Sequence, residues 1–129
     1  MVPSLLTDDE FKALIDKAPL VSIDLIVKNK KNEILLGFRK NAPAKNTWFL
    51  PGGRILKNEK LDEAFVRITL NELNQKIDRS EATFLNNFEH FYENENKFEI
   101  EGIDTHYIVI CKLPRILDQF KLESCFLLK

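Results

Sequence analysis

The sequence predicts an α/β fold, because two helical patterns are interleaved with strand patterns. Thr7 and Glu10 have the spacing of a capping box, which opens a helix that runs to about Ala18. Residues 61–73 place apolar side chains at helical intervals and are followed by Asn74, a suitable C-cap. Apolar and β-branched residues predict strands at 21–27, 33–38, 81–92 and 104–112.

Length and composition indicate one globular domain, residues 1–129, with 44% hydrophobic and 30% charged residues. The net charge of −1 favours neither a nucleic acid nor an anionic membrane as a partner. The first residues, MVPSLLTDDEF, have no signal-peptide pattern, and no apolar run has the length of a membrane span. We therefore expect a cytoplasmic enzyme or binding protein.

The helix at 61–73 carries one acid on its apolar side. In a helical projection from Glu72, Leu61 and Phe65 lie about 20° to either side of it. A carboxylate in such a place is costly unless it is paired, hydrogen-bonded or bound to a cation. Glu72 therefore either bends out to water or holds a metal ion. On the opposite side, Glu63 and Arg67 have the spacing of a surface ion pair.

Three further charged residues invite either a structural or a functional interpretation. Asp24 interrupts the apolar strand, either as a hydrogen-bonded buried acid or as an active-site carboxylate that orients a cationic partner or the attacking water. Arg39 follows the strand at 33–38, and Arg54 follows a glycine pair. Both could be surface arginines, but guanidinium groups also bind phosphate oxygens bidentately.

Residues 48–74, WFLPGGRILKNEKLDEAFVRITLNELN, are expected to form a short strand, a Pro-Gly-Gly turn, a loop and the helix. The segment resembles the Nudix box, the loop–helix signature of Nudix hydrolases, whose usual form is G-x5-E-x7-R-E-U-x-E-E-x-G-U with U a bulky apolar residue. The box would occupy residues 53–75, and the positions that match it are Gly53, Glu59, Arg67 and Glu72.

The positions that depart from the box indicate which branch of the family the sequence resembles. Ile68 and Asn71 stand where the box has acids, and Asn74-Gln75 stands in place of its final Gly-U. Loss of the acid next to the arginine, with the later Glu72 kept, is similar to the GDP-mannose mannosyl hydrolase branch. The resemblance runs from about residue 11 to 110 and includes PLVSIDLIV, ILLGFRKNAPAKNTWFLPGGR, EHFYE and THYIVI.

The resemblance implies a Nudix-type α/β/α sandwich with a mixed sheet, whose last strand and helix are not apparent in the sequence. It also implies Mg²⁺-dependent hydrolysis of GDP-mannose or a related GDP-hexose, in which water attacks the sugar C1 and releases GDP and the free sugar. One Mg²⁺ per active site would be held by Glu72 and the Gly52 carbonyl. The family is commonly dimeric, so a homodimer is expected.

The resemblance also assigns roles to individual residues. The resemblance implicates Arg39, Arg54 and Tyr107 in catalysis, where they would bind the diphosphate leaving group. Asp24, inferred above from the strand pattern, completes the set of expected catalytic residues. The guanine nucleotide would contact Leu5, Leu6 and Phe11. The chain has two histidines, and we interpret the strand residue His90 as structural.

One family feature is missing after Tyr107, where the mannosyl hydrolases have a Gln-His pair that supplies a metal ligand and the general base. The tail contains no histidine and offers only Gln119, Ser124 and Cys125. We therefore expect GDP-sugar binding with weak or absent turnover, in which the base could be replaced by Asp24, Glu59 or His106. The alternatives are a Nudix pyrophosphohydrolase that releases GMP and sugar phosphate, and a catalytically inactive nucleotide-binding remnant.

Overall fold

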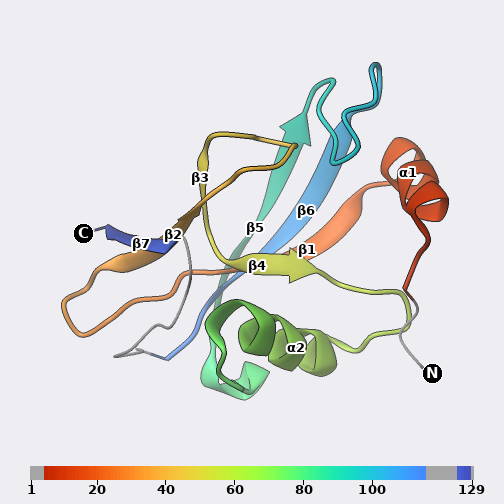
Figure 1. Cartoon of the computed structure of the whole chain (residues 1–129). Helices are drawn as coiled ribbons and strands as arrows, with labels where there is room; N and C mark the ends of the chain where they lie inside the picture. The colour runs from red at the N-terminus through yellow and green to blue at the C-terminus, as the bar shows by residue number, and fades with distance from the viewer. Residues whose placement is uncertain (1–4, 116–124, 129) are drawn as a thin grey trace.

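The computed structural model describes residues 5–115 and 125–128 (Figure 1). In chain order its elements are α1 (Asp8–Lys17), β1 (Leu20–Leu25), β2 (Ile34–Phe38), β3 (Trp48–Phe49), β4 (Gly52–Arg54), α2 (Leu61–Leu73), the 3₁₀ turn η1 (Arg79–Glu81), β5 (Thr83–Tyr92), β6 (Thr105–Leu113) and β7 (Cys125–Leu128).

The strands form two sheets. The larger has the order β4-β1-β6-β5, in which β1 and β6 are parallel and the other two pairs antiparallel. The smaller, β3-β2-β7, is antiparallel and lies beside the larger sheet on the side away from α1 (Figure 1). The prediction of an α/β fold with a mixed sheet is confirmed.

The start of α1 and the end of α2 lie where the local sequence predicts them. At α1 the Thr7 hydroxyl accepts a hydrogen bond from the Glu10 amide at 3.2 Å, and the Glu10 carboxylate accepts one from the Thr7 amide at 3.0 Å. Such a cap contributes about 1 kcal/mol to helix stability. At α2 the residue after the last turn, Asn74, adopts the left-handed conformation with φ 54° and donates its amide to the Leu70 carbonyl.

Helix α2 covers one face of the four-stranded sheet and forms the core with it. Its buried apolar residues pack with those of β1 and β2 in a cluster of Ile23, Leu25, Val27, Leu35, Ala64, Phe65, Ile68, Leu73 and Ile77. Leu61, expected on the buried side, is 41% exposed because it lies in the first turn, outside this cluster. Glu72 is half-buried at the other end of the helix.

Two expectations about local structure are wrong. The Pro-Gly-Gly segment does not turn through unusual backbone angles; Gly52 and Gly53 lie in β4, where they pair with β1. A closing strand is also present: the apolar segment Cys125–Leu128 pairs with β2 and satisfies backbone groups along that edge. Within the described residues no α-helix follows α2, and η1 is a single turn of 3₁₀ helix. None of the described helices is long and apolar enough to span a membrane.

Candidate active site

Strand register brings residues from four strands to one face of the larger sheet. Ser22 pairs with Val109, two residues beyond Tyr107, and Tyr107 in turn pairs with His90. Because directly paired residues point to the same face and alternate residues repeat it, Asp24 lies on this face as well. Arg54 pairs with Ser22 and Gly52 pairs with Asp24, which adds β4 to the same surface.

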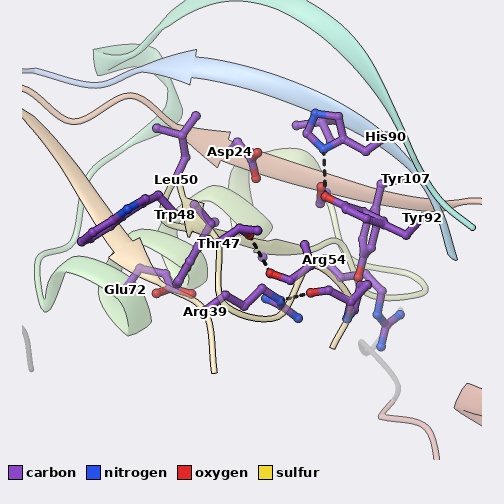
Figure 2. Close-up of a pocket in the computed structure, with 17 residues that line it drawn as sticks. Asp24, Arg39, Thr47, Trp48, Leu50, Arg54, Glu72, His90, Tyr92 and Tyr107 are labelled. Carbon is purple, nitrogen blue, oxygen red and sulfur yellow. Dashed lines mark hydrogen bonds between the residues drawn. The ribbon is translucent and has the colours of Figure 1, made fainter. Parts of the chain in front are cut away.

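This face forms the floor of a cavity of about 380 Å³ (Figure 2). The loop from β2 to β4 supplies much of the remaining wall, and Glu72 enters from α2. The lining consists of Ser22, Asp24, Arg39, Pro43, Ala44, Thr47, Trp48, Phe49, Leu50, Gly52, Gly53, Arg54, Glu72, His90, Tyr92, Tyr107 and Val109. The cavity therefore brings together all four implied catalytic residues and both implied metal-binding residues.

The two glycines of β4 let neighbouring elements approach closely. A Cβ on Gly52 would collide with the Ile23 carbonyl oxygen and would lie 2.6 Å from Asp24 Oδ1. A Cβ on Gly53 would lie 3.2 Å from the Ile68 side chain on α2. Because β4 is an edge strand, this close packing allows Glu72, one turn beyond Ile68, to reach the cavity on the other face.

The two carboxylates of the cavity are destabilised in their charged form. Burial raises the pKa of Asp24 to about 6, and the charge of Glu72 adds to that shift. Burial also raises the pKa of Glu72. Within residues 5–115 neither side chain has a cationic or hydrogen-bonding partner, so their proximity carries an uncompensated repulsion.

This donor set fits a hard divalent cation. Mg²⁺ prefers oxygen ligands, and one or two carboxylates suffice when substrate phosphates supply further oxygens. Glu72 and the carbonyl of Gly52 would hold the ion, with Asp24 facing the same space. No cluster of three or more Asp, Glu, His or Cys side chains suited to a metal occurs in the described part of the chain. The geometry is thus that of a site with few protein ligands.

Glu59 does not belong to the cavity. Its side chain is 3% exposed and accepts two hydrogen bonds from Arg67, at 2.6 Å from Nε and 2.9 Å from Nη2. Arg67 Nη2 also donates to the Arg54 carbonyl at 2.7 Å, and Glu59 accepts from the Leu56 amide at 3.0 Å. These bonds, led by the one from Arg67, lower the pKa of Glu59. The expected Arg67–Glu63 ion pair is therefore wrong, because Arg67 turns toward the loop before α2.

The two arginines of the cavity are held by different neighbours. Arg39 donates through Nε to the Pro43 carbonyl and through Nη2 to the Ala42 carbonyl at 3.4 Å, which bends the loop around it. The Arg54 guanidinium lies 4.7 Å from the centre of the Phe11 ring on α1. Each guanidinium keeps donors available for an anion in the cavity.

Two tyrosines and a histidine complete the wall formed by β5 and β6. Burial raises the pKa of Tyr107 and of Tyr92, so both hydroxyls stay protonated and can donate. The Tyr92 hydroxyl lies 3.5 Å from Nδ1 of His90. His106 is absent from the cavity because it points to the other face, where it stacks on Phe91 at 4.3 Å.

The residues expected to bind the nucleotide do not line this cavity. Leu5 is 81% exposed, and Phe11 packs against Arg54 and edge-on against Phe98. Leu6 lines a separate apolar cavity of about 680 Å³ between α1 and the loop after β4. Arg54 borders both cavities, which makes them neighbours on either side of one guanidinium.

Sequence reasoning did not assign a cavity position to His90, Tyr92 or Trp48. The spacing of His90 and Tyr92 puts them on one face of a strand, but only the pairing with β6 tells which face that is. Gln119 and Ser124, considered as replacements for the missing Gln-His pair, lie outside the described residues, as does the side chain of Cys125.

A family model described as the NUDIX domain matches residues 18–122. This chain belongs to the Nudix family. It is 40% identical over 116 residues to the low-salt glycan biosynthesis protein Agl8 of Haloferax volcanii, a match that covers 90% of the chain and 70% of that protein. Nudix hydrolases generally use divalent metal ions such as Mg²⁺, which agrees with the donor set of the cavity.

Solved structures give the same family fold. A MutT Nudix hydrolase from Burkholderia pseudomallei superimposes with a TM-score of 0.61 at 25% identity, covering 87% of this chain and 84% of that one. A MutT/Nudix family protein from Enterococcus faecalis also reaches 0.61, at 21% identity and over 95% of this chain. The Nudix chain described here spans 49% of the length of the Enterococcus protein.

Proposed function

We propose that this Nudix hydrolase cleaves GDP-mannose or a related GDP-hexose to GDP and the free sugar, by attack of water at the sugar C1 with one Mg²⁺ per site. The observation that carries the proposal is the small number of carboxylates that the Nudix box supplies to the cavity. Glu72 alone among the box residues offers a carboxylate to the cavity, whereas Glu59 is bonded to Arg67. Ile68 and Asn71, in place of acids, offer none.

A site with few carboxylates is suited to a single metal ion that acts on the leaving group. Enzymes of the family that attack phosphorus use several box glutamates to hold more metal ions, and such a cluster is absent from the described residues. When bound, the Mg²⁺ would neutralise charge on the departing diphosphate. Arg39, Arg54 and the protonated Tyr107 would donate hydrogen bonds to the same oxygens as that charge develops.

The sugar would occupy the part of the cavity between the two arginines and the wall of β5 and β6. Inversion at C1 requires a water molecule on the side of the sugar opposite the diphosphate. Asp24 lies on the sheet face of the cavity (Figure 2) and would orient the water or the sugar. The guanine base would extend past Arg54 toward the apolar cavity bordered by Leu6, with Phe11 under the Arg54 guanidinium.

The relative supports a nucleotide-sugar substrate in general terms. The Haloferax protein is named for glycan biosynthesis, a process that consumes activated sugars, and its match covers 90% of this chain. The identity of the hexose and of the nucleoside stays a prediction of the residue pattern.

Product analysis tests the proposal. The purified chain is incubated with GDP-mannose and Mg²⁺, and the products are separated by ion-exchange chromatography. We expect GDP and free mannose, released slowly because no histidine among the residues from 108 to 129 can act as the family's base. GMP with mannose 1-phosphate would contradict the proposal and favour the pyrophosphohydrolase. Mg²⁺-dependent binding of GDP without any turnover would favour the inactive remnant.

A further inference from the structure

The function proposed above leaves two ionisable side chains of the cavity, His90 and Tyr92, without a role. His90 is half-buried on β5, where it lines the cavity with Asp24 and Tyr92. Figure 2 shows its ring on the wall of β5 and β6, across the cavity from Arg39 and Glu72. A diphosphate bound to Arg39 and to a Mg²⁺ ion held by Glu72 would therefore leave the space next to His90 to the sugar and to water.

The imidazole is held at one nitrogen and open at the other. Nδ1 of His90 lies 3.5 Å from the Tyr92 hydroxyl, and the two rings meet edge-on with centroids 6.2 Å apart. Within residues 5–115, Nε2 of His90 makes no hydrogen bond. An imidazole with one nitrogen oriented by a neighbour and the other open is suited to exchange a proton with a ligand in the cavity.

His106, the second histidine, cannot exchange a proton with a ligand in this cavity. His106 is next to Tyr107 on β6 and so points to the opposite face of the sheet. There its ring stacks on Phe91 with an interplanar angle of 21°, and its Nε2 is buried. The two histidines lie on neighbouring strands of one sheet, so His106 is a matched control for His90.

We propose that His90 accepts the proton of the attacking water, and this inference rests on the proposed attack at C1. The water oxygen forms a bond to C1 while the bond from C1 to the diphosphate oxygen breaks, and its electron pair leaves with GDP. Neutral His90 carries its ring hydrogen on Nδ1, which donates to the Tyr92 hydroxyl oxygen, so Nε2 has a free electron pair. One proton of the water moves to this Nε2 and is later released to solvent. Tyr92 is a positioning residue that orients the ring through Nδ1.

Paired substitutions test the role of His90. His90→Asn and His106→Asn are assayed for GDP release from GDP-mannose with Mg²⁺, beside the unchanged chain. We expect His90→Asn to lower kcat by about 10²-fold or more, in the range of general-base effects, with KM changed only a few-fold. His106→Asn should keep kcat within a few-fold. Equal effects of the two variants, or no effect of His90→Asn, would overturn the role of His90.

Chemical rescue separates proton transfer from mere packing. His90→Ala opens space beside Tyr92, and imidazole added to the assay can occupy that space and take the proton. We expect GDP release by His90→Ala to rise with imidazole concentration, whereas the unchanged chain and His106→Ala do not respond. Calorimetric binding of GDP with Mg²⁺ by His90→Ala, at the affinity of the unchanged chain, would show that it is folded. A folded variant without rescue would contradict the proposal.

The outcomes distinguish this inference from the function on which it rests. If the unchanged chain releases GDP and free sugar while His90 can be replaced without loss, only the role of His90 fails. If it releases GMP and sugar phosphate, or nothing at all, the attack at C1 and the role of His90 both fail.

Discussion

At the scale of single residues, Glu72 and Asp24 decide what the cavity can bind. Both are partly desolvated, both have a raised pKa, and Asp24 feels the charge of Glu72. Two such groups, without a cationic partner in the described part of the chain, repel each other when both are ionised. A divalent cation relieves this repulsion, which is why the residues fit Mg²⁺ better than they fit a purely structural role.

Replacing Glu72 by Gln should abolish most of the Mg²⁺-dependent activity. The amide keeps the shape of the side chain but removes the charge that holds the ion, so we expect a loss of about 10²-fold or more in kcat/KM. Glu63→Gln, which removes the same charge from an exposed position on the opposite side of α2, is the control. A Glu72→Gln variant with an unchanged rate and unchanged Mg²⁺ dependence would remove Glu72 from the metal site.

Asp24 should make the metal-free protein less stable as the pH rises. Its pKa is raised from 3.8 to about 6 by folding, so the native state holds the proton more tightly than the unfolded chain does. Stability is therefore lost between about pH 4 and pH 6, with an upper bound of about 3 kcal/mol.

Urea denaturation with a metal chelator measures this effect. Asp24→Asn should be more stable than the unchanged protein at pH 7 and equally stable near pH 4. Added Mg²⁺ should narrow the difference at pH 7, because binding to the native state offsets the repulsion. A variant that is destabilised equally at both pH values would show that Asp24 is held by a hydrogen bond instead.

At the scale of elements, the loop before α2 is fixed by a partly buried ion pair. Arg67 links Glu59 to the Arg54 carbonyl, so one guanidinium ties the helix to β4 and to the cavity wall. This arrangement explains why the box keeps Glu59 and Arg67 although neither lines the cavity.

Glu59→Gln should lower the free energy of unfolding by about 2 kcal/mol, because it leaves the half-buried Arg67 without its charge partner. It should also weaken GDP binding, since the Arg54 backbone loses an anchor. Glu63→Gln is the control: Glu63 is exposed, precedes Arg67 by one turn and should change stability by less than about 0.5 kcal/mol. Equal effects in thermal or urea unfolding would contradict the importance of the pair.

The elements differ in how far the sequence predicts them. The cap at Thr7 and both ends of α2 follow from neighbouring residues, and they are observed as expected. The strand Gly52–Arg54 has no side-chain pattern of its own, because two of its three residues are glycines. The partner of Arg67 and the cavity position of His90 depend on contacts with distant segments, which local periodicity cannot show.

At the scale of the whole molecule, the cavity is built on one face of the sheet while α2 covers the other. All the residues with implied catalytic roles meet there, but the nucleotide-binding residues expected on and before α1 lie beyond Arg54. The two cavities on either side of Arg54 would let one ligand extend across the molecule, with the phosphates at the guanidinium.

The expected homodimer stays a prediction, and β5 is the surface on which we expect a second copy. Within the described sheet β5 is an edge strand, and four apolar residues on it are exposed: Phe84 at 51%, Leu85 at 42%, Phe88 at 47% and Phe91 at 65%. Pairing of two such edges would satisfy open backbone groups and bury these side chains. Light scattering should show a dimer, and Phe88→Glu should shift it toward monomer. A monomeric unchanged protein would contradict this expectation.

Hydrolysis in ¹⁸O-labelled water tests the central claim, that water attacks the sugar and not a phosphate. The chain is incubated with GDP-mannose and Mg²⁺, and the products are analysed by mass spectrometry. We predict ¹⁸O in the released mannose and none in GDP. Label in GDP, in GMP or in mannose 1-phosphate would place the attack at phosphorus and contradict the account.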